Sequence, residues 1–180
     1  MLQEFTQELK NNMMDTLRDV HTVIPGKIVT FDPDKCEASI LPFGKFKKPD
    51  GVMMDYPQLN EVPVYIIQGS GQTATIVYPV KKDDECLVLF SEQALDTWQT
   101  KAESNIDLKF DLSNAVAIVG MFSKPNLLMR RACDNDSIII QREGTFIELT
   151  TQNINMEAAG NIVMKAGAGI TMSAPLINLN

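Results

Sequence analysis

The hydrophobic residues near the start of the chain recur every three or four positions, with polar residues between them. This spacing places them on one face of an α-helix, so the pattern predicts a helix over residues 1–20. The predicted stripe consists of Leu2, Phe5, Leu9, Met13, Leu17 and Val20. Its polar side is not rich in lysine, which disfavours a lipid surface. We therefore expect the stripe to pack on its own domain or on a neighbouring chain.

Residues 21–125 follow a different pattern, with short runs that alternate in polarity or are continuously apolar. Such runs are typical of β-strands. The strands predicted in this way are 26–31, 36–41, 61–67, 73–78, 85–90 and 115–119. Five or six short strands within about 100 residues predict a small barrel or a sandwich, and the pattern alone does not choose between the two.

The segments between these strands carry weaker signals. Pro25 and Gly26 mark the boundary between the helix and the first strand. Residues 45–56 are irregular and contain Pro-Asp-Gly, which predicts a loop. Pro63 predicts that the strand over 61–67 starts late or lies at a sheet edge. Residues 91–100 suit one short helix or an irregular crossing.

The C-terminal residues carry a repeat of seven or eight positions. Its isoleucines are Ile139, Ile147, Ile154, Ile162, Ile170 and Ile177, and five of them are followed two places later by Leu149, Met156, Met164, Met172 and Leu179. Polar or small residues mostly alternate with these positions, and glycines or Pro175 separate the units. Each unit therefore predicts a short strand with two apolar side chains on one face.

These short strands need something to cover their apolar face, because hairpins of this size are not stable alone. A β-helix made by one chain would need about 18 residues per coil, so the units would give only about two coils. A meander buried on the preceding domain, or three chains wound about one axis, would supply the cover. Only the three-chain arrangement gives every repeat the same surroundings, and it predicts a prism on the order of 28 Å long.

Composition narrows the class of protein. The 180 residues suffice for one ordinary domain with an extension, and 44% hydrophobic with 22% charged residues indicate a globular chain. The net charge of −7 argues against a partner bound mainly through phosphates. No apolar run is long enough to cross a bilayer. Glu4 and Glu8 near the N-terminus do not suit a secretion signal.

The chain offers few residues for catalysis or metal binding. Cys36, Cys86 and Cys133 are odd in number and widely spaced, so we expect three reduced cysteines acting as small core hydrophobes. His21 is the sole histidine and has no partner base, so we expect a linker residue rather than a catalytic base. The acidic run 83–85 suits a solvated turn better than a cation site or an acid–base pair. We expect no enzyme activity, no catalytic or metal site and no cofactor.

Three further features could bind a ligand but have simpler explanations. A basic and aromatic cluster could stack and neutralise a single nucleic-acid strand, although the overall acidity disfavours this. The residues of this cluster are Phe43, Lys45, Phe46, Lys47 and Lys48. Trp98 could be a ligand platform, but we expect a core anchor. Residues 167–169 (Gly-Ala-Gly) are not followed by a helix or by Lys-Ser/Thr, so we expect a turn and not a phosphate loop.

Several segments, taken in order along the chain, resemble one known group of proteins. They are 24–29 (IPGKIV), 78–80 (YPV), 84–92 (DECLVLFSE), 95–98 (LDTW) and 111–120 (DLSNAVAIVG), followed by the C-terminal repeats. Together they resemble the central, membrane-piercing spike proteins of contractile phage tails and baseplates. The resemblance covers essentially the whole chain. One departure is that Asp83 and Asp84 stand where the family usually has a Gly-Asp turn.

The resemblance implies a mainly β architecture. Residues 1–20 would form the N-terminal helix, 21–125 an OB-type small β-barrel, and 126–180 an intertwined triple-stranded β-helix formed by a homotrimer. The N-terminal end would attach to a tail hub or baseplate protein, and the spike would puncture the target cell envelope on sheath contraction. The protein would be made in the bacterial cytoplasm and reside in a virion or tail-like particle, either phage or bacteriocin-like.

The C-terminus departs from the needle-like members of the group, which end in an apex with a metal held by histidines. His21 lies far from the end, and the sequence stops at Asn180 directly after a repeat. We therefore expect a blunt prism that a separate tip protein caps. The alternative is a trimeric OB-type module that binds nucleic acid or carbohydrate. Salt-sensitive oligonucleotide binding would favour that alternative, whereas the spike has no specific nucleic-acid partner.

Overall fold

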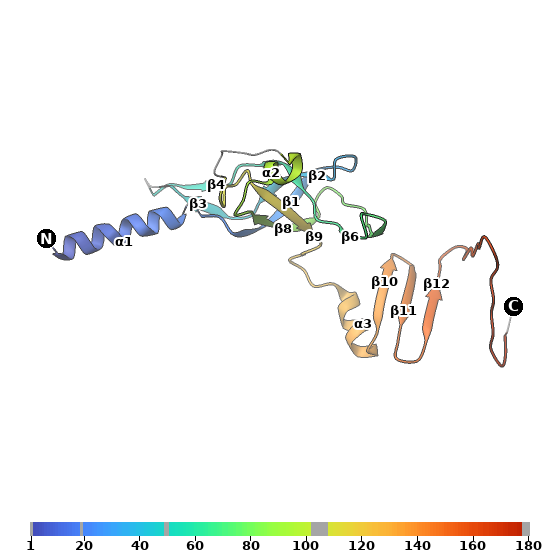
Figure 1. Ribbon diagram of the computed structural model, residues 1–180. Coiled ribbons are helices and arrows are strands. Elements are labelled where there is room, and N and C mark those ends of the chain that lie inside the picture. The colour runs from blue at the N-terminus through green and yellow to red at the C-terminus, as the bar shows by residue number, and fades with distance from the viewer. Residues whose placement is uncertain (1, 19, 49–50, 102–107, 178–180) are drawn as a thin grey trace. The chain divides into compact units, whose positions relative to one another are not determined.

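The computed structural model of the protein describes residues 2–18, 20–48, 51–101 and 108–177 (Figure 1). The chain divides into two compact units, Met1–Lys124 and Pro125–Asn180. The first unit contains α1 (Leu2–Arg18), β1 (Val23–Asp32), β2 (Glu37–Pro42), β3 (Lys45–Lys47), β4 (Met53–Asp55), β5 (Leu59–Pro63), β6 (Ile67–Gly69), β7 (Ala74–Ile76), β8 (Glu85–Phe90), α2 (Leu95–Thr100) and β9 (Ala115–Val119). The second contains α3 (Leu127–Asn135), β10 (Ile138–Arg142), β11 (Thr145–Leu149) and β12 (Ile154–Glu157). The protein is therefore mainly β.

The helix α1 confirms the predicted N-terminal helix. Its side chains Phe5, Leu9 and Met13 are each more than half exposed, so in the single chain this part of the stripe is not packed on its own domain. The side chains of Leu2 and Leu17 lie outside the described residues. Among the described residues, no helix has the length and apolar character needed to cross a membrane.

Five strands of the first unit form one curled antiparallel sheet with the order β5-β2-β1-β8-β9. The chain after β5 reaches the opposite edge, where Val64 bridges Ala117 of β9 in parallel and the Tyr65 N–H donates to the Ala117 carbonyl at 2.8 Å. The sheet is thus a curled half-barrel whose two edges meet over a short stretch. This result favours a barrel over a sandwich, the two forms that the strand pattern left open.

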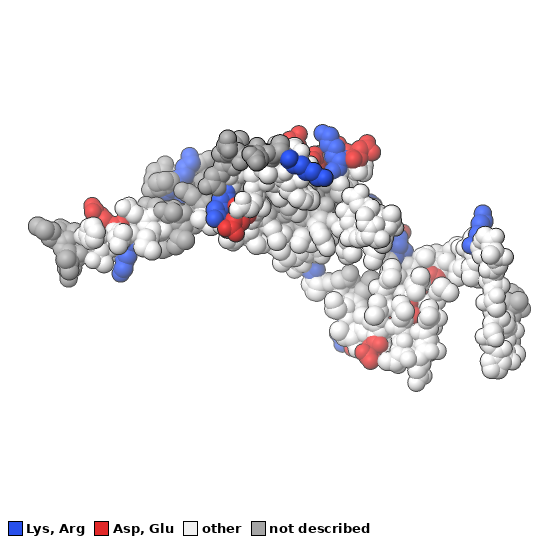
Figure 2. Space-filling model, viewed as in Figure 1, with Lys and Arg blue, Asp and Glu red and all other residues white. Residues whose placement is uncertain are grey.

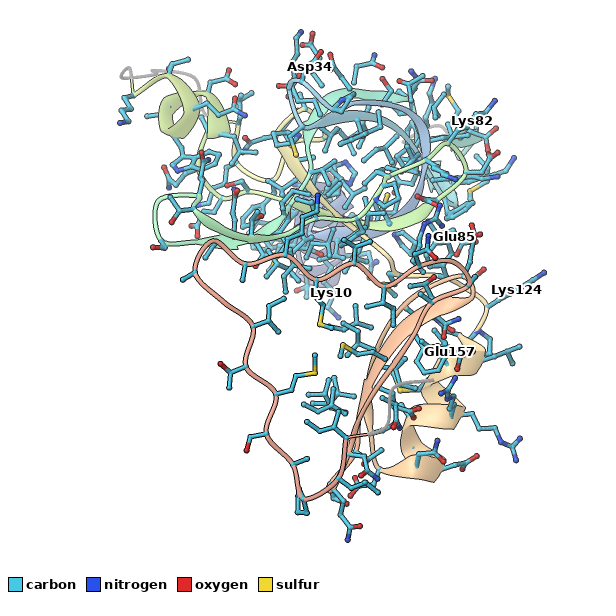
Figure 3. All side chains as sticks on the ribbon, turned by 90° about the vertical axis from the view of Figure 1, so that its right-hand side faces the viewer. Lys10, Asp34, Lys82, Glu85, Lys124 and Glu157 are labelled. Atoms are coloured by element: carbon cyan, nitrogen blue, oxygen red, sulfur yellow. The ribbon has the colours of Figure 1, made fainter. Side chains whose placement is uncertain are left out.

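The hydrophobic core fills the concave side of this sheet. Alternate residues of each strand point inward, as the pleat requires, and β8 alternates between buried and half-buried positions. The buried apolar residues are Ile28, Ala38, Ile40, Leu59, Val62, Val64, Cys86, Val88, Phe90, Ala115, Ala117 and Val119. The turn between β1 and β2 carries Asp34, labelled in Figure 3, whose N–H donates to the Asp32 carboxylate at 3.0 Å.

The strand β1 begins three residues before its predicted start and runs through Pro25 and Gly26. The sequence instead predicts a boundary at these two residues, and proline cannot donate a hydrogen bond to a ladder. Pairing on both sides overrides that local preference: Pro25 lies opposite Leu87 of β8, and its carbonyl accepts from the Phe43 N–H at 2.8 Å.

Gly26 is expected to be essential for this packing. A Cβ at this position would lie 2.7 Å from Ile40 Cγ2 and 3.3 Å from Val88 Cγ2, and both of those residues are fully buried. We expect Gly26→Val to destabilise the first unit by about 3 kcal/mol, because overpacking a filled core forces side chains off their rotamers. Thermal unfolding followed by circular dichroism measures the loss. Gly69→Val is the matched control, since nothing lies within 4 Å of a Cβ there, and an equal loss in both variants would contradict the prediction.

Two hairpins outside the main sheet differ from the sequence prediction. The expected loop over 45–56 contains the hairpin β3–β4, with Phe46 opposite Met54. The strand predicted over 61–67 instead starts at Leu59 and ends at Pro63; it does lie at a sheet edge, as Pro63 indicated. Ile67 belongs to β6, which pairs with β7 apart from the main sheet, and β7 lies within the strand predicted over 73–78. The strands β3, β4 and β6 have only three, mostly exposed residues and bury no regular face, so they leave no clear polarity signal in the sequence.

A buried asparagine organises the connection between β8 and β9. Asn114 is 2% exposed, and its side-chain amide donates to the carbonyls of Ser91, Gln93 and Leu108 at 3.0, 2.8 and 3.1 Å. Its side-chain oxygen accepts from the Leu95 N–H at 2.9 Å, at the start of α2. One side chain thus satisfies four backbone groups, which fixes where the chain leaves β8.

Trp98 is not the core anchor that we expected. It lies on α2 and is 71% exposed. The reason is that α2 has only six residues, none of them buried, so it has no face packed on the core.

The helix α3 in the second unit was not predicted, because the C-terminal repeat was extended back to residue 126. Asn126 caps it by accepting from the Leu128 N–H at 2.9 Å, and Asn is among the preferred N-caps. The strands β10, β11 and β12 follow as an antiparallel meander (Figure 1). The sequence does carry a helix signal here: the cap residue Asn126 is followed by Leu, Met, Arg and Ala, all good helix formers.

Candidate assembly surface

The meander β10–β12 has one face made of aliphatic side chains. Residues directly opposite each other in an antiparallel pair share a face, and the register places Ile140 opposite Ile147 and Leu149 opposite Ile154. The members of this face, here called the aliphatic face, are Ile138, Ile140, Ile147, Leu149, Ile154 and Met156. Their exposure ranges from 37% to 68%. A single chain therefore leaves a continuous apolar surface uncovered, which is a mark of an interaction site.

The strand register confirms most of the apolar positions predicted from the C-terminal repeat and corrects the first of them. Ile147, Leu149, Ile154 and Met156 lie on the aliphatic face as predicted. Ile139, however, lies opposite Glu148, on the other face of the sheet. The prediction was wrong here because it extended the spacing back by eight, whereas β10 places Ile138 and Ile140 on the face.

The opposite face of the sheet carries an ion pair with α3. Glu148 of β11 is 4% exposed, and its carboxylate accepts hydrogen bonds from Arg131 at 2.5 Å, Ser137 at 2.8 Å and Asn135 at 3.2 Å. The Arg131 guanidinium also lies 4.5 Å from the centre of the Phe146 ring. These contacts hold α3 to this face, so the aliphatic face is the one left open.

The hydrogen bonds from Arg131, and then those from Asn135 and Ser137, lower the pKa of Glu148 from its ordinary value of 4.5. A carboxyl group with a lowered folded-state pKa contributes stability above its unfolded-state pKa, and this stability is lost as the pH falls through the folded-state value. Sequence reasoning missed this cluster, because an acidic residue on the polar side of a strand usually faces solvent.

We expect Glu148→Gln to lower the unfolding temperature of the second unit at pH 7 and to leave it almost unchanged at the acidic end of a titration. The stability that the charge-assisted bond to Arg131 contributes is fully present above about pH 4.5, the ordinary pKa of the carboxyl group, and is lost as the pH falls through the lower folded-state pKa. The wild-type and variant curves should therefore converge as the pH falls. Thermal unfolding between pH 7 and pH 3 measures the difference. A constant difference across that range would contradict the assigned role of the Glu148 charge.

The chain after β12 continues the C-terminal repeat of apolar residues without forming a strand. The described residues 158–177 contain no strand (Figure 1), and Ile162, Met164, Ile170 and Met172 are each at least half exposed. Leu179, the last predicted member, lies outside the described residues. Lys165 is the sole charged residue of 158–177 in the sequence, and Figure 2 shows little charge over this segment.

Three residues were candidates for a catalytic base, an acid–base pair or a cation site. These residues, His21, Asp83 and Glu85, make structural contacts. The His21 ring packs against Tyr56 and Phe90, with ring centres 5.9 and 5.6 Å away, in the connection between α1 and β1. Asp83 lies in a turn and pairs with Lys27 at 3.0 Å. The Glu85 carboxylate accepts from the backbone N–H and the hydroxyl of Ser123, and these bonds lower its pKa. No group of three or more potential metal ligands occurs in the part of the chain that is described.

The three cysteines occupy different environments. Cys86 is buried, as expected of a core hydrophobe, and burial raises its pKa to about 11. Cys36 is half-buried, and burial followed by the charge of Glu37 raises its pKa. Both thiols are therefore neutral at pH 7 and poor nucleophiles. Cys133 is exposed on α3, so the expectation of a core position was wrong for this residue.

The basic residues 45–48 and the glycines 167–169 fit simple structural roles. Lys45 pairs with Asp55 across the β3–β4 hairpin at 3.3 Å, and the Phe46 ring lies 5.3 Å from that of Tyr56. A bend at residues 167–168 agrees with the predicted turn between repeats.

Comparison with known proteins identifies the first unit. Residues 24–120, which include all of the curled sheet except its first residue, match the family described as "Phage protein Gp138 N-terminal domain". No curated protein matches the chain at a significant level. The family supports a structural phage component and a place in the virion. Because the match covers more than half of the sequence, this chain belongs to the phage protein family defined by the Gp138 N-terminal domain.

Proposed function

We propose that the protein is the homotrimeric central spike of a contractile tail or baseplate, without enzyme activity. The observation that carries this proposal is the aliphatic face of β10–β12, which continues into the uncovered residues Ile162, Met164, Ile170 and Met172. Three copies around one axis would turn these side chains inward and cover them. Such a C-terminal triple-stranded β-helix would gain the burial that each chain lacks alone.

In this proposal the first unit is an OB-type barrel. The strand order β5-β2-β1-β8-β9, closed by the parallel contact between Val64 and Ala117, supports a five-stranded Greek-key barrel. The described apolar residues of α1 are exposed and would contact the tail hub. The barrel thus supplies the attachment end, and the second unit supplies the spike.

The spike would be driven into the target envelope when the sheath contracts. Backbone hydrogen bonds between chains and a dry apolar interior suit a part that must resist shear. A separate tip protein would contact the C-terminal repeats, whose apolar side chains are exposed in the single chain.

The alternative is a trimeric OB-type module that binds nucleic acid or carbohydrate. A cleft of about 600 Å³ lies beside β5 and α2, and its lining includes Glu37, Glu61, Asp96 and Asp111. Four carboxylates repel phosphates, so this cleft does not favour a nucleic-acid ligand.

Light scattering of the full-length chain tests the proposal. We expect a mass three times the chain mass of 20.0 kDa. The same preparation should show no salt-sensitive binding of a single-stranded oligonucleotide. A monomeric mass would overturn the trimeric spike, and tight oligonucleotide binding by a trimer would favour the alternative module.

A further inference from the structure

The strand β12 belongs to two patterns at once. It is the last strand of the in-chain meander, and it is also the first of three Ile-x-Met triplets. These triplets, at 154–156, 162–164 and 170–172, are each eight residues apart. Upstream the aliphatic face is irregular in spacing, nine residues from Ile138 to Ile147 and seven from Ile147 to Ile154. The regular repeat thus begins at the strand where pairing within the chain ends.

The second edge of β12 is open in the single chain. Among the described residues β12 pairs with β11 alone, so its other edge presents unpaired backbone groups. It ends at Glu157, labelled in Figure 3, and the next triplet follows after four residues, 158–161. A loop of this length is common in hairpins, yet residues 162–164 do not fold back onto β12.

We propose that the open edge of β12 pairs with residues 161–165 of a second copy of this chain. The strand β12 is then the point at which strand pairing passes from within one chain to between chains. This inference rests on the proposed trimer and specifies which strands of neighbouring chains pair with each other. Each chain gives one strand and receives one, so the contact is heterologous and closes after three copies. Residues 161–165 fit this edge because their Ile-x-Met triplet matches the Ile-x-Met triplet of β12.

The side chains fix the register of this pairing. The aliphatic face stays continuous only if Ile162 and Met164 lie on the same side as Ile154 and Met156. Side chains alternate along a strand, so an offset of two residues would keep the face but leave one apolar residue of each triplet without an apolar partner. Full overlap of the two triplets pairs all four apolar residues and places the middle residues opposite each other. Asn155 therefore faces Val163 of the neighbouring chain whether the two strands run parallel or antiparallel.

A disulfide between chains tests this register in the full-length protein. The exposed Cys133 and the half-buried Cys36 are replaced by serine, and Asn155→Cys and Val163→Cys are introduced into the same chain. Residues facing each other on neighbouring strands lie within disulfide reach. After mild oxidation we expect most of the chain to run as a covalent three-chain species on a denaturing gel. The matched control pairs Asn155→Cys with Thr171→Cys, the equivalent position of the next triplet, and is expected to give no such species.

The outcomes separate this inference from the proposed function. A mass of three chains with a disulfide inside one chain, or with cross-linking through Thr171→Cys instead, would overturn the inference and leave the trimer intact. A mass of one chain would overturn both. Hydrogen exchange of the unmodified protein gives a second measurement that needs no substitution. Slow exchange at residues 161–165, comparable to that of β12, is expected, and fast exchange there in a three-chain particle would also overturn the inference.

Discussion

The Ile162→Asp chain is expected to be monomeric where the unchanged chain forms a trimer. In the proposed assembly the three copies of residue 162 meet at one level of the axis, so the substitution would place three carboxylates in a dry apolar interior. Burying unpaired charges costs several kcal/mol or more, which exceeds what one layer of aliphatic contacts contributes. Light scattering at equal concentration measures the loss, and circular dichroism should show that the first unit stays folded.

Lys165→Asp is the matched control for this substitution. Lys165 directly follows Met164, and consecutive side chains of a strand point to opposite faces. If Met164 points to the axis of the assembly, Lys165 therefore points to solvent. The same carboxylate there should leave the mass at three chains. A stable trimer of the Ile162→Asp chain would contradict the inward orientation of the repeat. Dissociation of both variants would show that added negative charge, and not burial, controls assembly.

Much of the first unit could be predicted from polarity alone. The strands β2, β8 and β9 occur within one or two residues of the predicted bounds, because their buried positions alternate and leave a clear period. The strands β3, β4 and β6 escaped prediction because they are short and have no regular buried face, whereas β7 lies within the strand predicted over 73–78. The early start of β1 was also missed, since pairing on both sides overrides what Pro25 favours locally.

The second unit shows a different limit. The repeat predicted the aliphatic residues of β11 and β12 correctly, but a periodic pattern does not say which chain supplies the neighbouring strand. Within one chain the structure pairs β10, β11 and β12 with each other, and the three-chain winding of the rest stays a prediction. The ion pair of Arg131 and Glu148 could not be foreseen without α3, because a helix and a strand must first be placed together before a buried carboxylate acquires a partner.

The largest expected effect on the stability of the first unit is that of Asn114→Leu. Leucine has the same branched shape but a larger volume and no polar atoms, so the Gln93 carbonyl and the Leu95 N–H would lose the partner that Asn114 provides. The carbonyls of Ser91 and Leu108 would lose the Asn114 amide but keep the backbone N–H groups of Phe110 and Asp111 as donors. Each buried polar group left unpaired costs about 1–3 kcal/mol. Because some of these groups will find water, we expect a total loss of about 4 kcal/mol. Chemical denaturation of the full-length chain measures it.

Asn60→Leu is the control, since Asn60 lies on the edge strand β5 with an exposed side chain whose oxygen accepts a hydrogen bond from the exposed Gln58. A change there should stay within about 0.5 kcal/mol. Asn114→Asp separates hydrogen bonding from shape: it keeps the oxygen that accepts from Leu95 but turns a carboxylate toward three carbonyl oxygens, so it should destabilise at least as much as leucine. If Asn114→Asp were neutral, the amide donors of Asn114 would not organise the chain between β8 and β9. The position of α2 would then depend on the backbone bonds of the 108–114 segment alone.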